Sequence, residues 1–241
     1  MSVFVLVHGS WHDGAAWQAT IRQLERNGHK AFAPTMAGHG KGVNKAVNHS
    51  QCTQSIVDAI VAESLADFIL VGHSFGGTVI SKVAEAIPER IRRLVFLNGF
   101  VLRDGKSLTD EVPPETAEFF KQMAAQSPDR AFMLPFPVWR ETFVNDADLE
   151  TAKWTYAQLS PEPYQPTNDR LDLKKFYSLN IPKSYINCTE DIALPPGEWG
   201  WHPRMSNRLG LYRLVQMPGS HETLYTNPTL LAEKIVEAGR D

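Results

Sequence analysis

The sequence contains only two cysteines and no apolar run long enough to span a membrane. Cys52 and Cys188 lie far apart, in a predicted amphipathic helix and a predicted buried strand, so we expect no disulfide framework. The apolar start Val3 to Val7 is too short for a membrane span or a signal-peptide core, and it lacks a basic leading region and a cleavage site. These absences predict a cytoplasmic protein without a membrane partner, in which Val3 to Val7 is a first strand.

An excess of positive charge is also missing. The chain has 24 basic and 27 acidic residues and a net charge of -3, without a basic stripe, so we expect no nucleic-acid partner and favour small neutral substrates. Nucleotide-binding loops are absent too. Gly72, Gly76 and Gly77 do not have the G-x-G-x-x-G spacing, and no G-x-x-x-x-G-K-S/T motif occurs. We therefore expect no cofactor.

Short apolar runs alternate with helical periodicity along most of the chain. The periodicity predicts helices over residues 15–27, 51–64, 75–87 and 228–238. Alternation of this kind is typical of an α/β fold, with parallel strands joined by right-handed crossovers. With 241 residues, we predict a single domain over residues 1–241. The predicted strands are Val3 to Val7, Ala31 to Ala33, Phe68 to Val71, Leu94 to Leu97, Ser184 to Cys188 and Leu211 to Val215.

The alternation breaks after the fourth predicted strand, over residues of about 100–180. This segment combines many prolines with helical stretches and is too apolar for a solvated linker, so we predict a helical cap inserted in the domain. Its aromatic side chains are candidates for a substrate pocket, together with Gly9 and Trp11, although aromatic residues at helical spacing also serve simple packing. The candidates in the cap are Phe119, Phe120, Trp139, Trp154 and Tyr156.

The stretch "LVGHSFGGTVI" joins a predicted strand to a predicted helix through the motif Gly72, Ser74, Gly76. A serine in such a turn has its hydroxyl exposed above the sheet, because glycines on both sides allow a sharp, strained backbone. The alternative is that Ser74 is only the N-cap of the helix, but Gly77 after Gly76 weakens it, since glycines disfavour helices. The motif favours Ser74 as a nucleophile.

A second segment, "VHGSWHDGAAW", follows the first strand directly. Gly9 allows a tight turn, so the backbone N–H of Ser10 can face the same crevice as the N–H of Phe75. Two such donors would form an oxyanion hole at the start of the helix that follows Ser74.

Asp191 and His221 each follow a late strand, and with Ser74 they have the chain order nucleophile, acid, base. All three would emerge at the carboxyl edge of the sheet, where ligands bind in open α/β folds. His221 would accept the proton of Ser74, and Asp191 would fix the imidazole tautomer. Glu190 is the rival for the acid, while His73 is adjacent to Ser74 and cannot easily reach its hydroxyl.

His8 and His12 form a His-x-x-x-His pattern, which is a weak zinc signal without a third ligand. We therefore expect no metal, and we interpret His8 as a residue that orders the predicted oxyanion loop.

At this point the chain resembles the α/β-hydrolase superfamily, and more narrowly the plant-type methyl esterase and hydroxynitrile lyase family. The segments that carry the resemblance are "FVLVHGSWHDGAAW", "LERNGHKAFAPTMAGHG", "FILVGHSFGG", "YINCTEDIALP" and the tail from "GSHETL" to "NPTLLAEKI". The resemblance implies a six-stranded parallel sheet, a triad of Ser74, Asp191 and His221, and oxyanion donors at Ser10 and Phe75.

Two positions separate esterases from lyases within this family. The lyases carry a hydroxyl-bearing residue at the position of Gly9 and a lysine at the position of Glu222, so the resemblance favours an esterase. Glu222 also replaces an apolar residue of the plant esterases and Ser220 replaces their aspartate, which leaves the plant substrates open. The alternative is that Glu222 has no functional role and faces solvent in a turn.

We therefore predict a serine hydrolase that cleaves a small, largely apolar carboxylic ester or lactone through an acyl-enzyme. Two alternatives remain: carbon-carbon lyase or hydrolase chemistry on the same scaffold, and a ligand-binding module without catalysis. The expected partner is the small-molecule ester itself. Whether the chain forms a homodimer stays open.

Overall fold

A computed structural model describes residues 1–240 and contains one six-stranded, fully parallel sheet. The strand order is β2-β1-β3-β4-β7-β8, so β3 and β4 lie in the middle of the sheet. This arrangement confirms the predicted α/β class and the six parallel strands. The strands are β1 (Val3–Val7), β2 (Lys30–Phe32), β3 (Phe68–His73), β4 (Ile91–Leu97), β7 (Lys183–Cys188) and β8 (Arg213–Met217).

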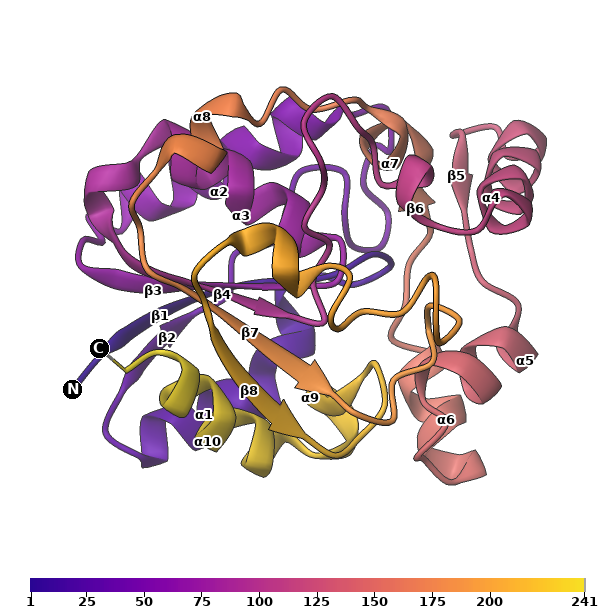
Figure 1. The fold of residues 1–241 in the computed structure, drawn as a ribbon. Coiled ribbons are helices and arrows are strands. Elements are labelled where there is room, and N and C mark those ends of the chain that lie inside the picture. Colours follow the sequence, from indigo (N-terminus) through magenta and orange to yellow (C-terminus); the bar gives the residue numbers. More distant parts are fainter. Residues whose placement is uncertain (241) are drawn as a thin grey trace.

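Helices cover both faces of the sheet (Figure 1). One face packs against α2 (His49–Ala62), α3 (Gly76–Ala86) and α8 (Lys174–Ser178), and the other against α1 (Gln18–Arg26) and α10 (Pro228–Ala238). Strand side chains alternate between the two apolar cores, which explains why β1 is apolar throughout: Val5 and Val7 enter one core, and Phe4 and Leu6 the other.

The helix boundaries follow the predicted ranges with small differences. The first predicted helix, residues 15–27, is divided into a 3-10 turn, η1 (Gly14–Trp17), and α1. The turn is capped by Asp13, whose side chain accepts the N–H of Ala15. No described helix is both long and apolar enough to cross a membrane.

The insertion between β4 and β7 gathers mainly beyond the carboxyl ends of these strands (Figure 1). We use the name cap for residues 109–168 of this insertion. They include η3 (Thr109–Glu111), α4 (Pro114–Gln126), β5 (Ala131–Phe132), α5 (Phe136–Val138), η4 (Trp139–Phe143), α6 (Leu149–Tyr156), β6 (Glu162–Pro163) and α7 (Tyr164–Asn168).

The predicted cap, residues 100–180, extends beyond this group of elements. Helix α8 packs on α3 instead, where Glu85 accepts the backbone N–H of Phe176 at 2.9 Å. A third apolar core lies within the cap and includes Trp11 from the loop after β1. The cap and this loop therefore share one packed interior.

Candidate active site

Ser74 lies in the sharp turn between β3 and α3 with a φ of 53°, in the left-handed region that residues other than glycine rarely adopt. The turn needs its glycines: a Cβ on Gly72 would lie 2.6 Å from the carbonyl oxygen of Gly76, and one on Gly76 would lie 2.7 Å from that of His8. The N-cap of α3 is Phe75, without a side-chain capping bond. The alternative of Ser74 as an N-cap is therefore wrong.

The loop after β1 lies against this turn. A Cβ on Gly9 would lie 2.9 Å from the Cβ of Ser74, so only glycine lets the loop approach so closely. Among residues 1–240, the backbone N–H groups of Ser10 and Phe75 have no acceptor. Two unused donors thus flank Ser74, as the sequence predicts for an oxyanion hole.

Asp191 and His221 meet at the end of β7 and β8. The His221 Nδ1 lies 2.6 Å from Asp191 Oδ2, and Asp191 Oδ1 accepts the N–H of Ala193 at 2.8 Å. Glu190, the rival acid, is exposed. The geometry favours Asp191 over Glu190, because only Asp191 contacts the imidazole.

Asn98 is a site residue that the sequence reasoning missed. It is fully buried at the end of β4, donates through Nδ2 to Asp191 Oδ2, and accepts the N–H of Cys188 at 2.9 Å. Asn98 therefore fixes the Asp191 carboxylate to the sheet. The available signal was a polar residue directly after an apolar strand, in "VFLNG".

His221 is buried among aromatic rings. Trp201 stacks on its ring at 5.1 Å and Phe143 meets it edge-on at 5.3 Å, while the His73 ring lies 4.7 Å away. Burial by itself lowers the pKa of His221, but the carboxylates of Asp191 and Glu222 outweigh burial, so its pKa is raised. The surroundings thus favour the imidazolium, which is the form that a general base reaches after accepting a proton.

Glu222 does not face solvent: its side chain is buried, and its Oε2 lies 3.0 Å from the Nε2 of His12. Burial raises the pKa of Glu222, but His12, His73 and His221 together lower it to about 2. The alternative of a solvent-facing Glu222 is therefore wrong. Ser220 is buried as well, and its N–H donates to Asp146 at 3.1 Å.

His8, in the loop after β1, bonds to two backbone groups. His8 donates through Nδ1 to the carbonyl of Gly9 at 2.9 Å and accepts the N–H of Met36 at 3.1 Å, so it orders the loop. Burial keeps the pKa of His8 well below its usual value.

One group of potential metal ligands occurs among the described residues: atoms of His73, His221 and Glu222 lie within 4.8 Å of one another. Each of these side chains already has a protein partner. His73 Nε2 lies 3.0 Å from the carbonyl oxygen of His221, while His221 bonds to Asp191 and Glu222 to His12.

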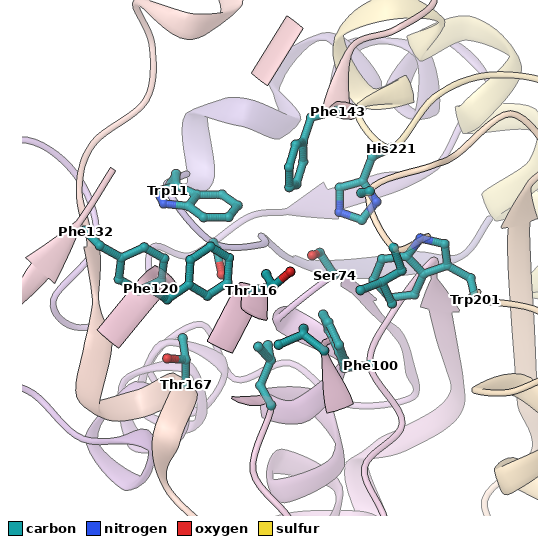
Figure 2. Close-up of a pocket in the computed structure, with 15 residues that line it drawn as sticks. Trp11, Ser74, Phe100, Thr116, Phe120, Phe132, Phe143, Thr167, Trp201 and His221 are labelled. Atoms are coloured by element: carbon teal, nitrogen blue, oxygen red, sulfur yellow. The ribbon is translucent and has the colours of Figure 1, made fainter. Parts of the chain in front are cut away.

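A cavity of about 50 Å³ lies beside Ser74 and His221. Figure 2 shows the Ser74 hydroxyl and the His221 ring facing the same space, which is bordered by aromatic rings. Apart from His221, no described residue that lines this cavity carries a titratable side chain. The apolar wall consists of Trp11, Phe100, Leu108, Val112, Phe120, Phe132, Phe143, Ala193, Leu194 and Trp201, and Thr116 and Thr167 add hydroxyl groups.

Of the predicted pocket aromatics, Trp11 and Phe120 line this cavity, whereas Phe119, Trp139, Trp154 and Tyr156 do not. Phe119 is 39% exposed, because it lies one residue from Phe120 on α4 and the helix turns it outward. Trp154 is 55% exposed and meets Tyr225 on the surface. Trp139 is fully buried behind the cavity wall, where it stacks on Phe143 and donates to Thr155.

Known proteins with similar sequences include esterases. A carbendazim hydrolyzing esterase from a Nocardioides species is 31% identical over 99% of this chain and 100% of its own length. An Arabidopsis thaliana protein described as "Putative methylesterase 11, chloroplastic" is 26% identical over 98% of this chain, which spans 64% of that longer protein.

The structure is also similar to that of an extracellular alpha/beta-hydrolase from a Paenibacillus species. That protein, described as sharing structural and functional homology with tobacco salicylic acid binding protein 2, is 47% identical, with a TM-score of 0.98 and 100% coverage of both chains. The model of the alpha/beta hydrolase family matches residues 4–234. The chain therefore belongs to the alpha/beta hydrolase family, among its carboxylic ester hydrolases.

Proposed function

We propose that the protein hydrolyses a small, largely apolar carboxylic ester or lactone through an acyl-enzyme on Ser74. The observation that carries the proposal is the 2.6 Å contact between His221 Nδ1 and Asp191 Oδ2. His221 and Ser74, whose backbone is strained, both line the same apolar cavity. The nucleophile, the base and the acid thus come from the ends of β3, β8 and β7.

In the proposed mechanism, the Ser74 Oγ attacks the ester carbonyl while its proton passes to Nε2 of His221. Asp191 holds Nδ1 protonated and stabilises the imidazolium. The N–H groups of Ser10 and Phe75 donate to the carbonyl oxygen as it becomes negative, and each donor of this kind contributes about 3 kcal/mol to transition-state stabilisation. The alcohol departs with the His221 proton, and water then releases the acid by the same steps.

The cavity wall supports a neutral substrate. Aromatic and aliphatic side chains dominate it, so the burial of apolar groups favours binding, whereas a charged group would lose its hydration without a compensating ion pair. The names of the relatives include a carbendazim esterase, a pyrethroid hydrolase and a methylesterase. This range supports the reaction class and leaves the acid and alcohol parts of the substrate open.

The surroundings of Glu222 do not favour cyanohydrin cleavage. An anionic carboxylate that is buried beside His221 would oppose the formation of cyanide, whereas the lyases in the resemblance carry a lysine at this position. The two unused N–H groups beside Ser74 likewise favour catalysis over simple ligand binding.

The variant Ser74→Ala tests the proposal directly. We expect its kcat for a p-nitrophenyl ester to fall about 10⁴-fold or more, because the variant lacks the hydroxyl that forms the acyl-enzyme. A fluorophosphonate should label the wild type and not this variant. Ser81→Ala, which removes another buried hydroxyl on α3, is the matched control and should stay active. Hydrolysis by Ser74→Ala at near wild-type rate would overturn the nucleophile assignment.

The cellular location and the oligomeric state stay predictions. One similar protein is described as extracellular and another as chloroplastic, so the comparisons do not favour the cytoplasm.

A further inference from the structure

Trp11 directly follows Ser10, and its backbone has a φ of 64°. This left-handed conformation is unfavourable for a bulky side chain, so contacts from outside the loop must maintain it. The same residue lines the cavity with its ring. The conformation of Trp11 therefore bears on both the apolar wall and the neighbouring donor, Ser10.

The cap holds the backbone of Trp11 at both of its polar groups. The N–H of Trp11 donates to Glu162 Oε2 at 2.8 Å, and its carbonyl accepts the N–H of Ser160 at 2.8 Å. Glu162 begins β6 and is fully buried. A segment about 150 residues away in sequence thus fixes the loop that follows β1.

The peptide group that contains the Ser10 N–H is held from the other side. The carbonyl oxygen of this peptide group belongs to Gly9, and it accepts the Nδ1–H of His8 at 2.9 Å. The next peptide group donates through Trp11 to Glu162, and the one after it accepts from Ser160. Consecutive peptide groups are therefore fixed on both sides of Ser10, which limits the directions in which its N–H can point.

Glu162 also contacts the surroundings of the second donor. Its Oε2 lies 3.1 Å from the Nε2 of His39, and the His39 ring stacks on the Phe75 ring with centroids 6.0 Å apart and an interplanar angle of 19°. One buried carboxylate thus reaches the Ser10 side of the site through Trp11 and the Phe75 side through His39.

We infer that Glu162 is a positioning residue of the oxyanion hole: its carboxylate, carried by the cap, holds the loop so that the Ser10 N–H faces the reacting carbonyl. This inference rests on the proposed function. A buried carboxylate is costly unless hydrogen bonds compensate. Among residues 1–240, the Trp11 N–H is the one hydrogen-bond donor to the Glu162 carboxylate: His39 Nε2 lies 3.1 Å from Oε2 without hydrogen-bond geometry, and Oε1 has no partner. The cap is therefore a component of the catalytic geometry as well as a wall of the cavity.

Three substitutions test the role of this carboxylate. Glu162→Met fills the same space but cannot accept the Trp11 N–H, so kcat should fall about 10- to 100-fold while KM changes less than about threefold. Glu162→Asp retains the charge, but its side chain is too short to reach the Trp11 N–H, so its kcat should fall by a similar factor. Glu162→Gln can still accept the bond through its amide oxygen, and its kcat should stay within about fivefold of the wild type.

A pair of inhibitors separates positioning from general loss of structure. A trifluoromethyl ketone adds to the serine and places an oxyanion in the hole, whereas the methyl ketone of the same shape binds without adding. The preference of the wild type for the first compound should decrease in Glu162→Met by about the same factor as kcat. Equal weakening of both compounds would indicate a merely structural role and overturn the inference. If Glu162→Met does not fold, Glu162→Asp gives the same comparison.

Glu85→Met is the matched control, because Glu85 is also a buried carboxylate that accepts a backbone N–H, but it lies on α3 and its partner, Phe176, belongs to α8 outside the cap. It should lose stability and retain the wild-type kcat. If Ser74→Ala is inactive and the Glu162 variants keep the wild-type kcat, this inference fails and the proposed function stands. If Ser74→Ala is active, the proposed function itself fails.

Discussion

Glu222 shows how a single residue can alter the chemistry of the site without lining the cavity. It directly follows His221, is buried, and is held in its ionised form by His12. Because a carboxylate only accepts hydrogen bonds, Nε2 of His12 must carry the proton, which leaves Nδ1 to face the Tyr225 hydroxyl at 3.4 Å. His221 therefore has two anionic neighbours, Asp191 and Glu222.

Substitution of Glu222 should shift the pH dependence of hydrolysis. The negative charge of Glu222 contributes to the raised pKa of His221, so Glu222→Gln should lower that pKa and move the acid limb of kcat/KM to lower pH. The other groups that face His221, namely Asp191 and His73, are unchanged in this variant.

The matched control for this pH profile is Glu190→Gln, which removes an exposed carboxylate one residue before Asp191. It should leave the acid limb in place, because solvent and salt screen its charge. An acid limb of Glu222→Gln that stays in place or moves to higher pH would contradict the electrostatic role of Glu222.

At the scale of elements, a buried ion cluster fixes the segment that carries Trp201. Glu111 of η3 is buried and binds the guanidinium groups of Arg204 at 2.9 Å and Arg208 at 2.8 Å, with Arg103 at 3.1 Å. Arg208 belongs to η5 (Ser206–Leu209). The start of the cap is thereby tied to the loop whose Trp201 stacks on His221.

Glu111→Gln should lower the free energy of unfolding by about 3 kcal/mol, because it leaves the half-buried arginines without a counter-charge. The KM for the ester should rise as well, since Trp201 would lose its support. Urea unfolding and steady-state kinetics measure the two effects. Glu118→Gln, which removes an exposed pair with Lys121, should leave the urea midpoint close to that of the wild type. Similar stability losses in the two variants would contradict the importance of the cluster.

At the scale of the whole molecule, several buried histidines make the fold sensitive to acid. Burial lowers the pKa of His73 to about 3 and that of His49 to about 4, and it also lowers that of His8. These groups regain their ordinary pKa of about 6.5 when the chain unfolds. The unfolded chain therefore binds more protons than the folded chain between these values, so stability must decrease as the pH falls below about 6.5.

We expect the urea midpoint to be lower at pH 5 than at pH 7.5. Each fully buried neutral histidine contributes about 2 kcal/mol to the loss at pH 5, and the raised pKa of His221 opposes it in part. His49 is the clearest case, because it lies away from the cavity and its Nε2 pairs with the Thr78 hydroxyl at 2.8 Å. His49→Gln should show a smaller difference between the two pH values, and an equal or larger difference would contradict this account.

The sequence by itself determined the elements of the fold and the identity of the turn at Ser74. Apolar runs at strand spacing, helical periodicity and the glycines of "GHSFGG" act over a few residues, and local sterics suffice to specify them. The same holds for the close approach at Gly9, where the absence of a side chain is visible in the sequence. These local features predicted the six parallel strands and the position of the site at their carboxyl ends.

Only the tertiary structure decided which side chains meet. It favoured Asp191 over Glu190, brought Asn98 to the acid, buried Glu222, and turned Phe120 toward the cavity but Phe119 and Trp154 toward solvent. It also brought Glu162 to Trp11 across about 150 residues of chain. Such contacts depend on how the cap packs on the edge of the sheet, and this packing balances burial, charge and shape over the whole molecule, which no local pattern records.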